Sequence, residues 1–245
     1  MLYLSRMKKD FTQETPLKVF TTFSGYDTQC LALKKAHIPF DLVGWSEIEP
    51  RAIKAHNLIF PEYAERNYGD ICKIDWKNVP DFDFFTYSSP CTNFSISGLR
   101  EGGDEGSGTK SSLLWECKKA IEIKKPKYLL MENVKNLVGK TFIDTFYSWL
   151  DYLESQGYTN YWKVLNGVDY GIPQARERVF CVSILNPEER FYFPKGIQLK
   201  KNVYDYSLTK EELGDTYNEL VMPIENYESY INDNEQFRKF ATKQK

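Results

Sequence analysis

The sequence predicts an α/β fold in which helices connect the strands of a central sheet. Between residues 17 and 184, short apolar runs typical of strands alternate with segments of helical periodicity, which is the pattern of βαβ units. Aromatic residues make up 16% of the 245-residue chain, so most of it can bury a core. A chain of this length fits one domain of moderate size.

The first part of the chain contains four predicted strands. They are residues 17–23, residues 40–45, a weaker run before Gly69, and residues 82–87. A helix is predicted at residues 28–36, between the first two strands. The next helix begins at Pro50, because proline suits the first turn of a helix.

The second part of the chain continues the alternation. One helix is predicted over residues 112–123, with Ser111 or Ser112 as its cap. Another covers residues 142–155 and ends at Gly157. The remaining strands are predicted at residues 128–131, 161–165 and 178–184.

The composition changes after Pro194. Residues 195–245 are mostly charged and polar, with scattered tyrosine and leucine. We therefore expect residues 1–194 to form the main domain and residues 195–245 to form a short polar appendage or tail.

Composition and charge exclude several classes of protein. The net charge of −2 and the pI of about 5.9 are less basic than is usual for a stand-alone nucleic-acid-binding protein. Five cysteines without a C-x-x-C pair, and only two histidines, argue against a zinc site and favour reduced thiols in the cytoplasm. No apolar run is long enough to span a membrane, and the polar N-terminus is unlike a signal peptide. We expect no metal, no membrane contact and a cytoplasmic location.

One cysteine stands where a nucleophile would be presented. Cys91 follows Pro90 directly after the predicted strand of residues 82–87, and a Ser/Gly-rich stretch then runs to Ser112. Proline restricts the backbone before the thiol, and open α/β sheets bind ligands at the carboxyl ends of their strands. Taken by itself, the residue fits a buried structural cysteine better.

Candidate ligand-binding residues follow the predicted strands in order. They are the turn Phe23, Ser24, Gly25, Tyr26 after the first strand, Glu47 and Ile48 after the second, Asp70 and Ile71 after the third, and Glu132 after the fifth. Each has an ordinary alternative as a turn residue or a helix-start carboxylate. Their common position at carboxyl ends indicates a cofactor pocket.

Three polar side chains share one face of a predicted extended segment. Gln174, Arg176 and Arg178 alternate along the chain, and alternating residues of extended backbone point the same way. The triplet could hold a phosphate or the polar edge of a base; the alternative is a polar strand face.

In that order, these segments resemble the cytosine-5 methyltransferases, especially the bacterial and phage DNA enzymes. The resemblance covers about residues 17–194. The motifs that carry it are the turn at Phe23–Ser24–Gly25, Glu47, Asp70, Pro90–Cys91, Glu132–Asn133–Val134 and Gln174-x-Arg176-x-Arg178. The resemblance implies a Rossmann-like methyltransferase sheet that is mostly parallel, with an antiparallel last strand.

The resemblance also implies a cofactor and a set of site residues. S-adenosylmethionine would lie near Phe23, Ser24, Gly25, Tyr26, Glu47, Ile48, Asp70, Ile71, Pro90 and Leu113. Cys91 would add to C6 of cytosine, Glu132 would bind and protonate N3, and Arg178 with Arg176 would hold the base. The substrate would be double-stranded DNA with the target cytosine flipped out, and the loop of residues 92–110 would close behind it.

The chain departs from the family pattern at several positions. Asp27 and Thr28 replace the usual glycines, and Thr92 stands where glutamine is common. A target-recognition region and the final Gly-Asn-Ser motif are not evident, and residues 195–245 are too short for both.

Three functional interpretations follow from these features. The first is a DNA methyltransferase of a bacterial or phage-infected cell, in a restriction-modification context, with a second chain as a candidate supplier of target recognition. The second is a catalytically silent remnant that serves as a binding or regulatory subunit, and the third is an RNA methyltransferase.

Overall fold

The computed structural model describes residues 10–90, 110–186 and 188–200. The chain divides into two units between Gln198 and Leu199. The site described below lies entirely in the first unit.

The described elements follow the predicted alternation of strands and helices. The strands are β1 Leu17–Thr22, β2 Phe40–Ser46, β3 Phe84–Tyr87, β4 Tyr128–Val134, β5 Thr159–Asn166 and β6 Glu177–Ile184. The α-helices are α2 Thr28–Lys35, α3 Pro50–Ile59, α4 Cys117–Lys124 and α5 Ile143–Ser155. Short 3₁₀ helices cover Pro61–Arg66, Ile71–Lys73, Lys110–Glu116, Lys135–Val138 and Gly167–Asp169.

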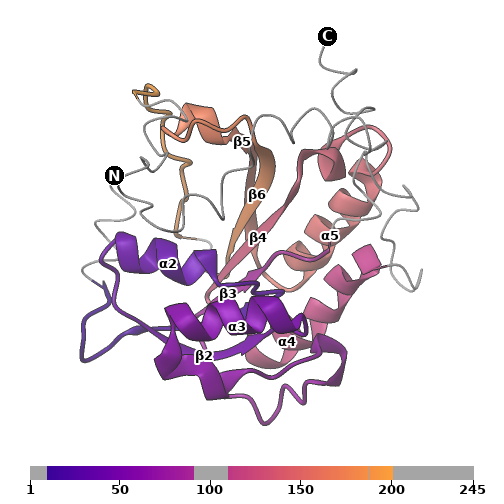
Figure 1. Ribbon diagram of the computed structural model, residues 1–245. Coiled ribbons are helices and arrows are strands. Elements are labelled where there is room, and N and C mark those ends of the chain that lie inside the picture. The colour runs from indigo at the N-terminus through magenta and orange to yellow at the C-terminus, as the bar shows by residue number, and fades with distance from the viewer. Residues whose placement is uncertain (1–9, 91–109, 187, 201–245) are drawn as a thin grey trace, which may run out of the picture. The chain divides into compact units, whose positions relative to one another are not determined.

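The strands form one six-stranded sheet in the order β2-β1-β3-β4-β6-β5. β1, β2, β3 and β4 pair in parallel, whereas β6 is antiparallel to both β4 and β5. This arrangement confirms the predicted parallel sheet with an antiparallel last strand. Figure 1 shows β6 next to β4, with α2 and α3 grouped around β2.

The sheet packs a separate apolar cluster on each face. On one face, Phe85 and Met131 pack with Ala120 of α4 and with Trp149 of α5. On the other, here called the α2 face, Val19 and Leu42 pack with Leu33 of α2 and with Ile53 of α3. Over β3, β4 and β6, the α2 face borders a cavity that residues of α2 also line.

A register shift in the pairing of β1 with β2 affects the α2 face. Between Val19 and Phe20 the pairing of β1 with β2 slips, so that Val19 pairs with Leu42 but Phe20 pairs with Gly44. The slip places Leu42 and Trp45 in the same cluster although they are three residues apart. Trp45 thereby lies over α3.

The predicted third strand is wrong. The segment before Gly69 forms a single parallel bridge, between Trp45 and Asn67. The Asn67 side chain replaces further strand pairing: its Oδ1 accepts from the N–H groups of Glu47 at 3.2 Å and Gly69 at 2.9 Å. Gly69 then turns the chain with φ of 69°, which ends extended structure.

Two boundaries also differ from expectation. β4 runs through Val134, so Glu132 lies within the strand and not beyond its end. The predicted cap at Ser111 or Ser112 is wrong, because a 3₁₀ helix from Lys110 to Glu116 leads directly into α4. Among the described residues, no helix is long and apolar enough to cross a membrane.

Candidate active site

The turn after β1 is shaped by three residues with left-handed backbone. Phe23, Gly25 and Asp27 have φ of 53°, 57° and 65°, a conformation that costs L-residues energy but not glycine. The turn is bonded to the end of β2, since the Ser24 N–H donates to the Ser46 carbonyl at 3.2 Å. The result is a compact backbone at the carboxyl end of β1.

Glu47 hydrogen-bonds this turn to the segment after β2. Its Oε2 accepts from the Gly25 N–H at 2.9 Å, and its Oε1 accepts from the N–H groups of Ile48 at 2.8 Å and Glu49 at 2.9 Å. A carboxylate has about four acceptor sites, so about one remains for a ligand hydroxyl. Glu47 therefore helps to fix the shape of the turn after β1.

The other predicted cofactor residues differ in how exposed they are. Ile48 is 67% exposed and Tyr26 is 50% exposed, so both can pack against a ligand. Ile71 is buried in the core cluster, which leaves little of its side chain for an adenine ring. Asp70 caps the 3₁₀ helix at Ile71–Lys73 by accepting from the Cys72 N–H at 3.0 Å. Leu113 is half-buried in the 3₁₀ helix that begins at Lys110.

Glu132 and Arg178 form an ion pair on neighbouring strands. Arg178 Nε lies 3.1 Å from Glu132 Oε1, and both side chains are about a quarter exposed, at 22% and 26%. In the antiparallel register Glu132 faces Phe180, so Arg178 is its diagonal neighbour on the same face. The sequence predicts a site role for each of these two residues but no contact between them, and the structure brings them together as an ion pair.

The environment of Glu132 shifts its proton affinity. Burial raises the pKa of the Glu132 carboxyl, while the charges of Arg178 and Arg176 oppose that rise, and the net direction is upward. A carboxyl group with a raised pKa can hold or deliver a proton at an adjacent ligand atom. This is the behaviour expected of a group that binds and protonates a ring nitrogen.

The segment that leads to Cys91 is anchored from two sides. Asn133, which is buried, donates through Nδ2 to the carbonyl and the hydroxyl of Ser89, at 3.3 Å in each case. Gln29 of α2 donates to the Ser88 hydroxyl at 3.1 Å. Sequence reasoning did not assign either role. Pro90 ends the described segment, and Cys91 with the loop to residue 109 lies outside the described residues.

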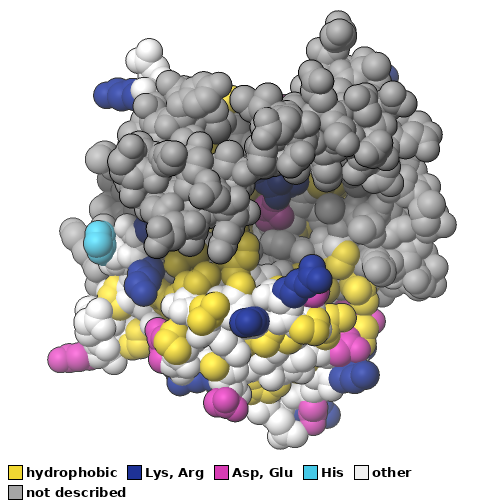
Figure 2. Space-filling model, viewed as in Figure 1, with side chains coloured by type: hydrophobic (Ala, Val, Ile, Leu, Met, Phe, Trp, Pro, Cys, Tyr) yellow, Lys and Arg dark blue, Asp and Glu magenta, His cyan; other side chains and the backbone are white. Residues whose placement is uncertain are grey.

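A cavity of about 1070 Å³ brings many of the predicted groups together. Its polar lining comes from the turn after β1 and from Gln29, Ser88, Glu132, Gln174 and Arg176. Glu47, Ile48, Asp70, Ile71, Pro90, Leu113 and Arg178 are not among its lining residues, although Glu47 and Arg178 contact groups that are. Figure 2 shows a hollow that holds acidic and basic side chains, with hydrophobic side chains gathered beside it.

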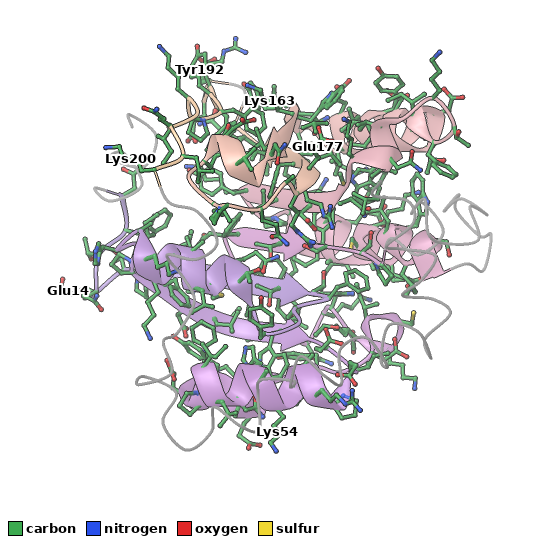
Figure 3. The ribbon with its side chains drawn as sticks, turned by 45° about the horizontal axis from the view of Figure 1, so that its top comes forward. Glu14, Lys54, Lys163, Glu177, Tyr192 and Lys200 are labelled. Carbon is green, nitrogen blue, oxygen red and sulfur yellow. The ribbon has the colours of Figure 1, made fainter. Side chains whose placement is uncertain are left out.

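The cavity continues along the apolar α2 face. Leu33 of α2, Phe84 of β3, Leu130 of β4 and Phe180 of β6 line this part, and Phe191 borders it. Nearby, Tyr192 is 79% exposed and points outward from the molecule in Figure 3. The cavity therefore has a polar end at the strand termini and an apolar end along the sheet.

Comparison with known proteins identifies the family of this chain. The family model of C-5 cytosine-specific DNA methylases matches residues 17–245. The chain belongs to this family of methyltransferases.

Several curated relatives are similar in sequence. The Type II methyltransferase M2.ScrFI of Lactococcus lactis subsp. cremoris is 45% identical, over 77% of this chain and 67% of that protein. The orphan methyltransferase M.SssI of Spiroplasma monobiae is 41% identical, over 60% of this chain and 39% of that protein. The Type II methyltransferase M.HhaI of Haemophilus parahaemolyticus is 33% identical, over 82% of this chain and 60% of that protein. The chain thus spans two thirds of the first relative and less of the other two.

Solved structures share the fold at lower sequence identity. The Dnmt2 methyltransferase of S. pombe has a TM-score of 0.57 at 23% identity, covering 72% of this chain and 52% of that one. The methyltransferase EhMeth of Entamoeba histolytica has a TM-score of 0.60 at 20% identity, covering 82% and 65%. These likenesses confirm the methyltransferase fold of the sheet.

Proposed function

We propose that this chain methylates C5 of cytosine in DNA through a covalent intermediate at Cys91. The observation that carries the proposal is the placement of the Glu132–Arg178 pair next to Asn133, which holds Ser89 only two residues before Cys91. A carboxyl group with a raised pKa and the segment that leads to Cys91 both lie near the carboxyl ends of the parallel strands, which supports the proposal. Family membership supports the same chemistry.

The residues of this chain have distinct roles in the proposed reaction. The Cys91 thiolate forms a bond to C6, and the electron pair of the C5–C6 double bond becomes available at C5 while Glu132 delivers a proton to N3. Arg178 and Arg176 hold the ring and oppose negative charge that develops on it. After the methyl group is added, C5 loses its proton to a base, the S–C6 bond breaks, the N3 proton returns to Glu132, and the ring double bond and the Cys91 thiolate are restored.

The described residues fit S-adenosylmethionine as the cofactor. When bound, it supplies an electrophilic methyl group. Glu47 retains about one free acceptor site for a ribose hydroxyl, Gly25 lets the backbone approach closely, and Ile48 and Tyr26 present exposed apolar surface. Asp70, Pro90 and Leu113 complete the proposed pocket. Ile71 is buried, so it offers little surface for contact with the cofactor.

Cofactor binding is tested by titration calorimetry with the demethylated product, S-adenosylhomocysteine. Glu47→Ala should weaken binding about tenfold or more, because it removes a charge-assisted bond worth about 1.5–3 kcal/mol and frees the Gly25 N–H. Lys54→Ala is a matched surface control, since Lys54 points away from the molecule in Figure 3. If the unmodified chain failed to bind, the pocket assignment would be wrong.

The substrate is proposed to be double-stranded DNA with a flipped cytosine. The target atoms are stacked inside a duplex, so the base must leave the stack to reach Glu132 and Cys91. Transfer of tritiated methyl groups to duplex DNA, to single-stranded DNA and to RNA distinguishes the substrates. Label in duplex DNA at C5 supports the proposal. Label only in RNA would favour the RNA alternative, and no label in any substrate would favour a silent binding subunit.

We further propose that residues 195–245 are a polar appendage and that target recognition requires a polypeptide segment beyond residues 1–194. Sequence is read through base-edge contacts in a groove. The roles proposed above for the described residues concern the cofactor and the flipped base, and none of them concerns that task. A second chain is one source of such a segment. Strong site-specific methylation by the 245-residue chain alone would refute the need for a second chain. We also propose that the activity takes place in the cytoplasm of a bacterial or phage-infected cell, because a DNA substrate and reduced thiols are both expected there.

A further inference from the structure

A buried polar cluster lies directly beneath the turn after β1. Thr21, Ser24, Asp27 and His56 are each no more than 5% exposed. The Thr21 hydroxyl donates to Asp27 Oδ2 at 2.8 Å and lies 2.8 Å from the Ser24 hydroxyl. Two side chains of the turn, Ser24 and Asp27, are therefore both hydrogen-bonded to Thr21 in the protein interior.

Asp27 is an unusual choice for its position. Its backbone has φ of 65° and ψ of 57° at the start of α2, and its side chain makes no capping hydrogen bond to that helix. Glycine would adopt this conformation without a steric cost. Since the carboxylate neither caps the helix nor reaches solvent, its role is in the contacts that it makes inside the cluster.

Two polar atoms in this cluster, one on Asp27 and one on His56, make no hydrogen bond. Asp27 Oδ1 and His56 Nε2 are buried and have no hydrogen-bond partner among the described residues. Yet His56 Nε2 lies 3.6 Å from Asp27 Oδ2, with both side chains 0% exposed. Buried polar atoms without partners are costly, so a movement of well under 1 Å that closed this contact would be favourable. The Cys30 thiol also lies near, and burial and the Asp27 carboxylate both raise its pKa, so that it stays protonated.

His56 is held rigidly from its other side. Its ring stacks on Trp45 with centroids 3.7 Å apart and planes at 20°. Trp45 Nε1 donates in turn to the Tyr63 carbonyl at 2.8 Å. Trp45 belongs to β2, two residues before Glu47, and α3, which carries His56, starts immediately after Glu49. His56 is therefore attached to the same segment that presents Glu47 to the turn.

We propose that Asp27 and His56 are positioning residues that set the turn after β1 for cofactor binding. The Asp27–His56 contact connects the turn to α3, and the Trp45 stack connects α3 to β2. Glu47 connects the turn to the segment after β2 through the Gly25 N–H. Neither His56 nor Asp27 lines the cavity, so the pair acts on the cofactor indirectly, through the position of the turn. This inference rests on the proposed cofactor site.

Substitutions separate this role from a merely structural one. His56→Phe keeps an aromatic ring against Trp45 but removes the group that faces Asp27; His56→Gln keeps a donor. We expect His56→Phe and Asp27→Asn each to weaken S-adenosylhomocysteine binding about fivefold to tenfold, and His56→Gln to stay within about twofold of the unmodified chain. The double variant should bind no worse than either single variant, because the two residues act as one unit.

Ser183→Ala provides the matched control. Ser183 is fully buried and donates to Asn160 Oδ1 at 2.7 Å. It pairs with Leu129 near the amino end of β4, whereas the turn lies at the carboxyl end of β1. This variant should lower the melting temperature without changing the affinity. If His56→Phe lowered only the melting temperature, or if the effects of the single variants multiplied in the double variant, the inference would be overturned.

Amide hydrogen exchange in the ligand-free chain gives a readout that does not depend on the cofactor. His56→Phe should speed exchange at the amides of Ser24 and Gly25 more than at those of β5 and β6. Equal protection of the turn in both proteins would overturn the inference even if the cofactor were never bound. Failure of the unmodified chain to bind S-adenosylhomocysteine would instead count against the proposed function.

Discussion

Asn133→Ala tests how the segment that leads to Cys91 is held in place. In the native chain, Asn133 Nδ2 donates to the Ser89 carbonyl and hydroxyl at 3.3 Å, and Oδ1 accepts from the Val134 N–H at 2.9 Å. Asn133 is 2% exposed and Ser89 is 4% exposed, so water does not readily replace these bonds. The substitution removes the only side chain that we find joining β4 to Ser89 among the described residues.

The magnitude follows from the groups left without partners. Three groups lose their bonds: the Ser89 carbonyl, the Ser89 hydroxyl and the Val134 N–H. The hydroxyl can rotate toward another partner, so two groups at about 1–3 kcal/mol each give about 2–6 kcal/mol. A typical folding free energy is about 5–15 kcal/mol, so the chain should still fold. For a domain of this size, 1 kcal/mol corresponds to about 2–4 °C, and the melting temperature should fall on the order of 10 °C.

The assay combines thermal melting with alkylation of Cys91 by a thiol reagent. Asn78→Ala is the matched control, because Asn78 donates to Asp75 at an exposed turn, where a change of no more than about 0.5 kcal/mol is expected. Asn133→Ala should melt earlier and alter the rate of Cys91 alkylation, while Asn78→Ala should change neither. If Asn133→Ala melted and reacted like the unmodified chain, the anchoring role of Asn133 would be refuted.

Two further predictions concern the turn and the acid. Gly25→Ala should cost about 1 kcal/mol, because the position has φ of 57° although no atom lies within 4 Å of an added Cβ; calorimetric unfolding checks this, and an unchanged stability would contradict the backbone argument. For Glu132, the raised pKa of the folded state means that the native chain binds its proton more tightly than the unfolded chain, so this group's contribution to stability is present at low pH and is lost as pH rises from the ordinary glutamate range through the raised value. Glu132→Gln should flatten that part of the pH–stability curve, and an equally steep curve for the variant would refute the assignment.

Much of the fold follows from local patterns in the sequence. The alternation of apolar runs and helical periods is sufficient to place the strands, and Pro50 does begin α3, which Glu49 caps by accepting from the Ala52 N–H at 2.8 Å. The prediction of a third strand is wrong because the Asn67 side chain, and not the backbone of a strand, accepts hydrogen bonds from the N–H groups of Glu47 and Gly69. Such a replacement depends on Glu47, a residue distant in the sequence, and leaves no periodic signal.

In the candidate site too, some residues could be predicted from local sequence and others depend on contacts between distant residues. Glu132 and Arg178 could be named from their motifs, and the antiparallel register explains why they meet. Gln29 and Asn133 were not assigned because their partners, Ser88 and Ser89, lie far from both in sequence. His56 carried no local signal at all, since only the register shift in β2 places Trp45 against it.

The central claim is that Cys91 forms a covalent bond to cytosine with the help of Glu132. A duplex that carries 5-fluorocytosine at target sites tests it directly, because fluorine at C5 cannot leave as a proton and the adduct persists. With S-adenosylmethionine and any recognition polypeptide present, the unmodified chain should form a complex stable to denaturation, Glu132→Gln should form it more slowly, and Cys91→Ala should form none. Trapping that persisted in Cys91→Ala would contradict the account.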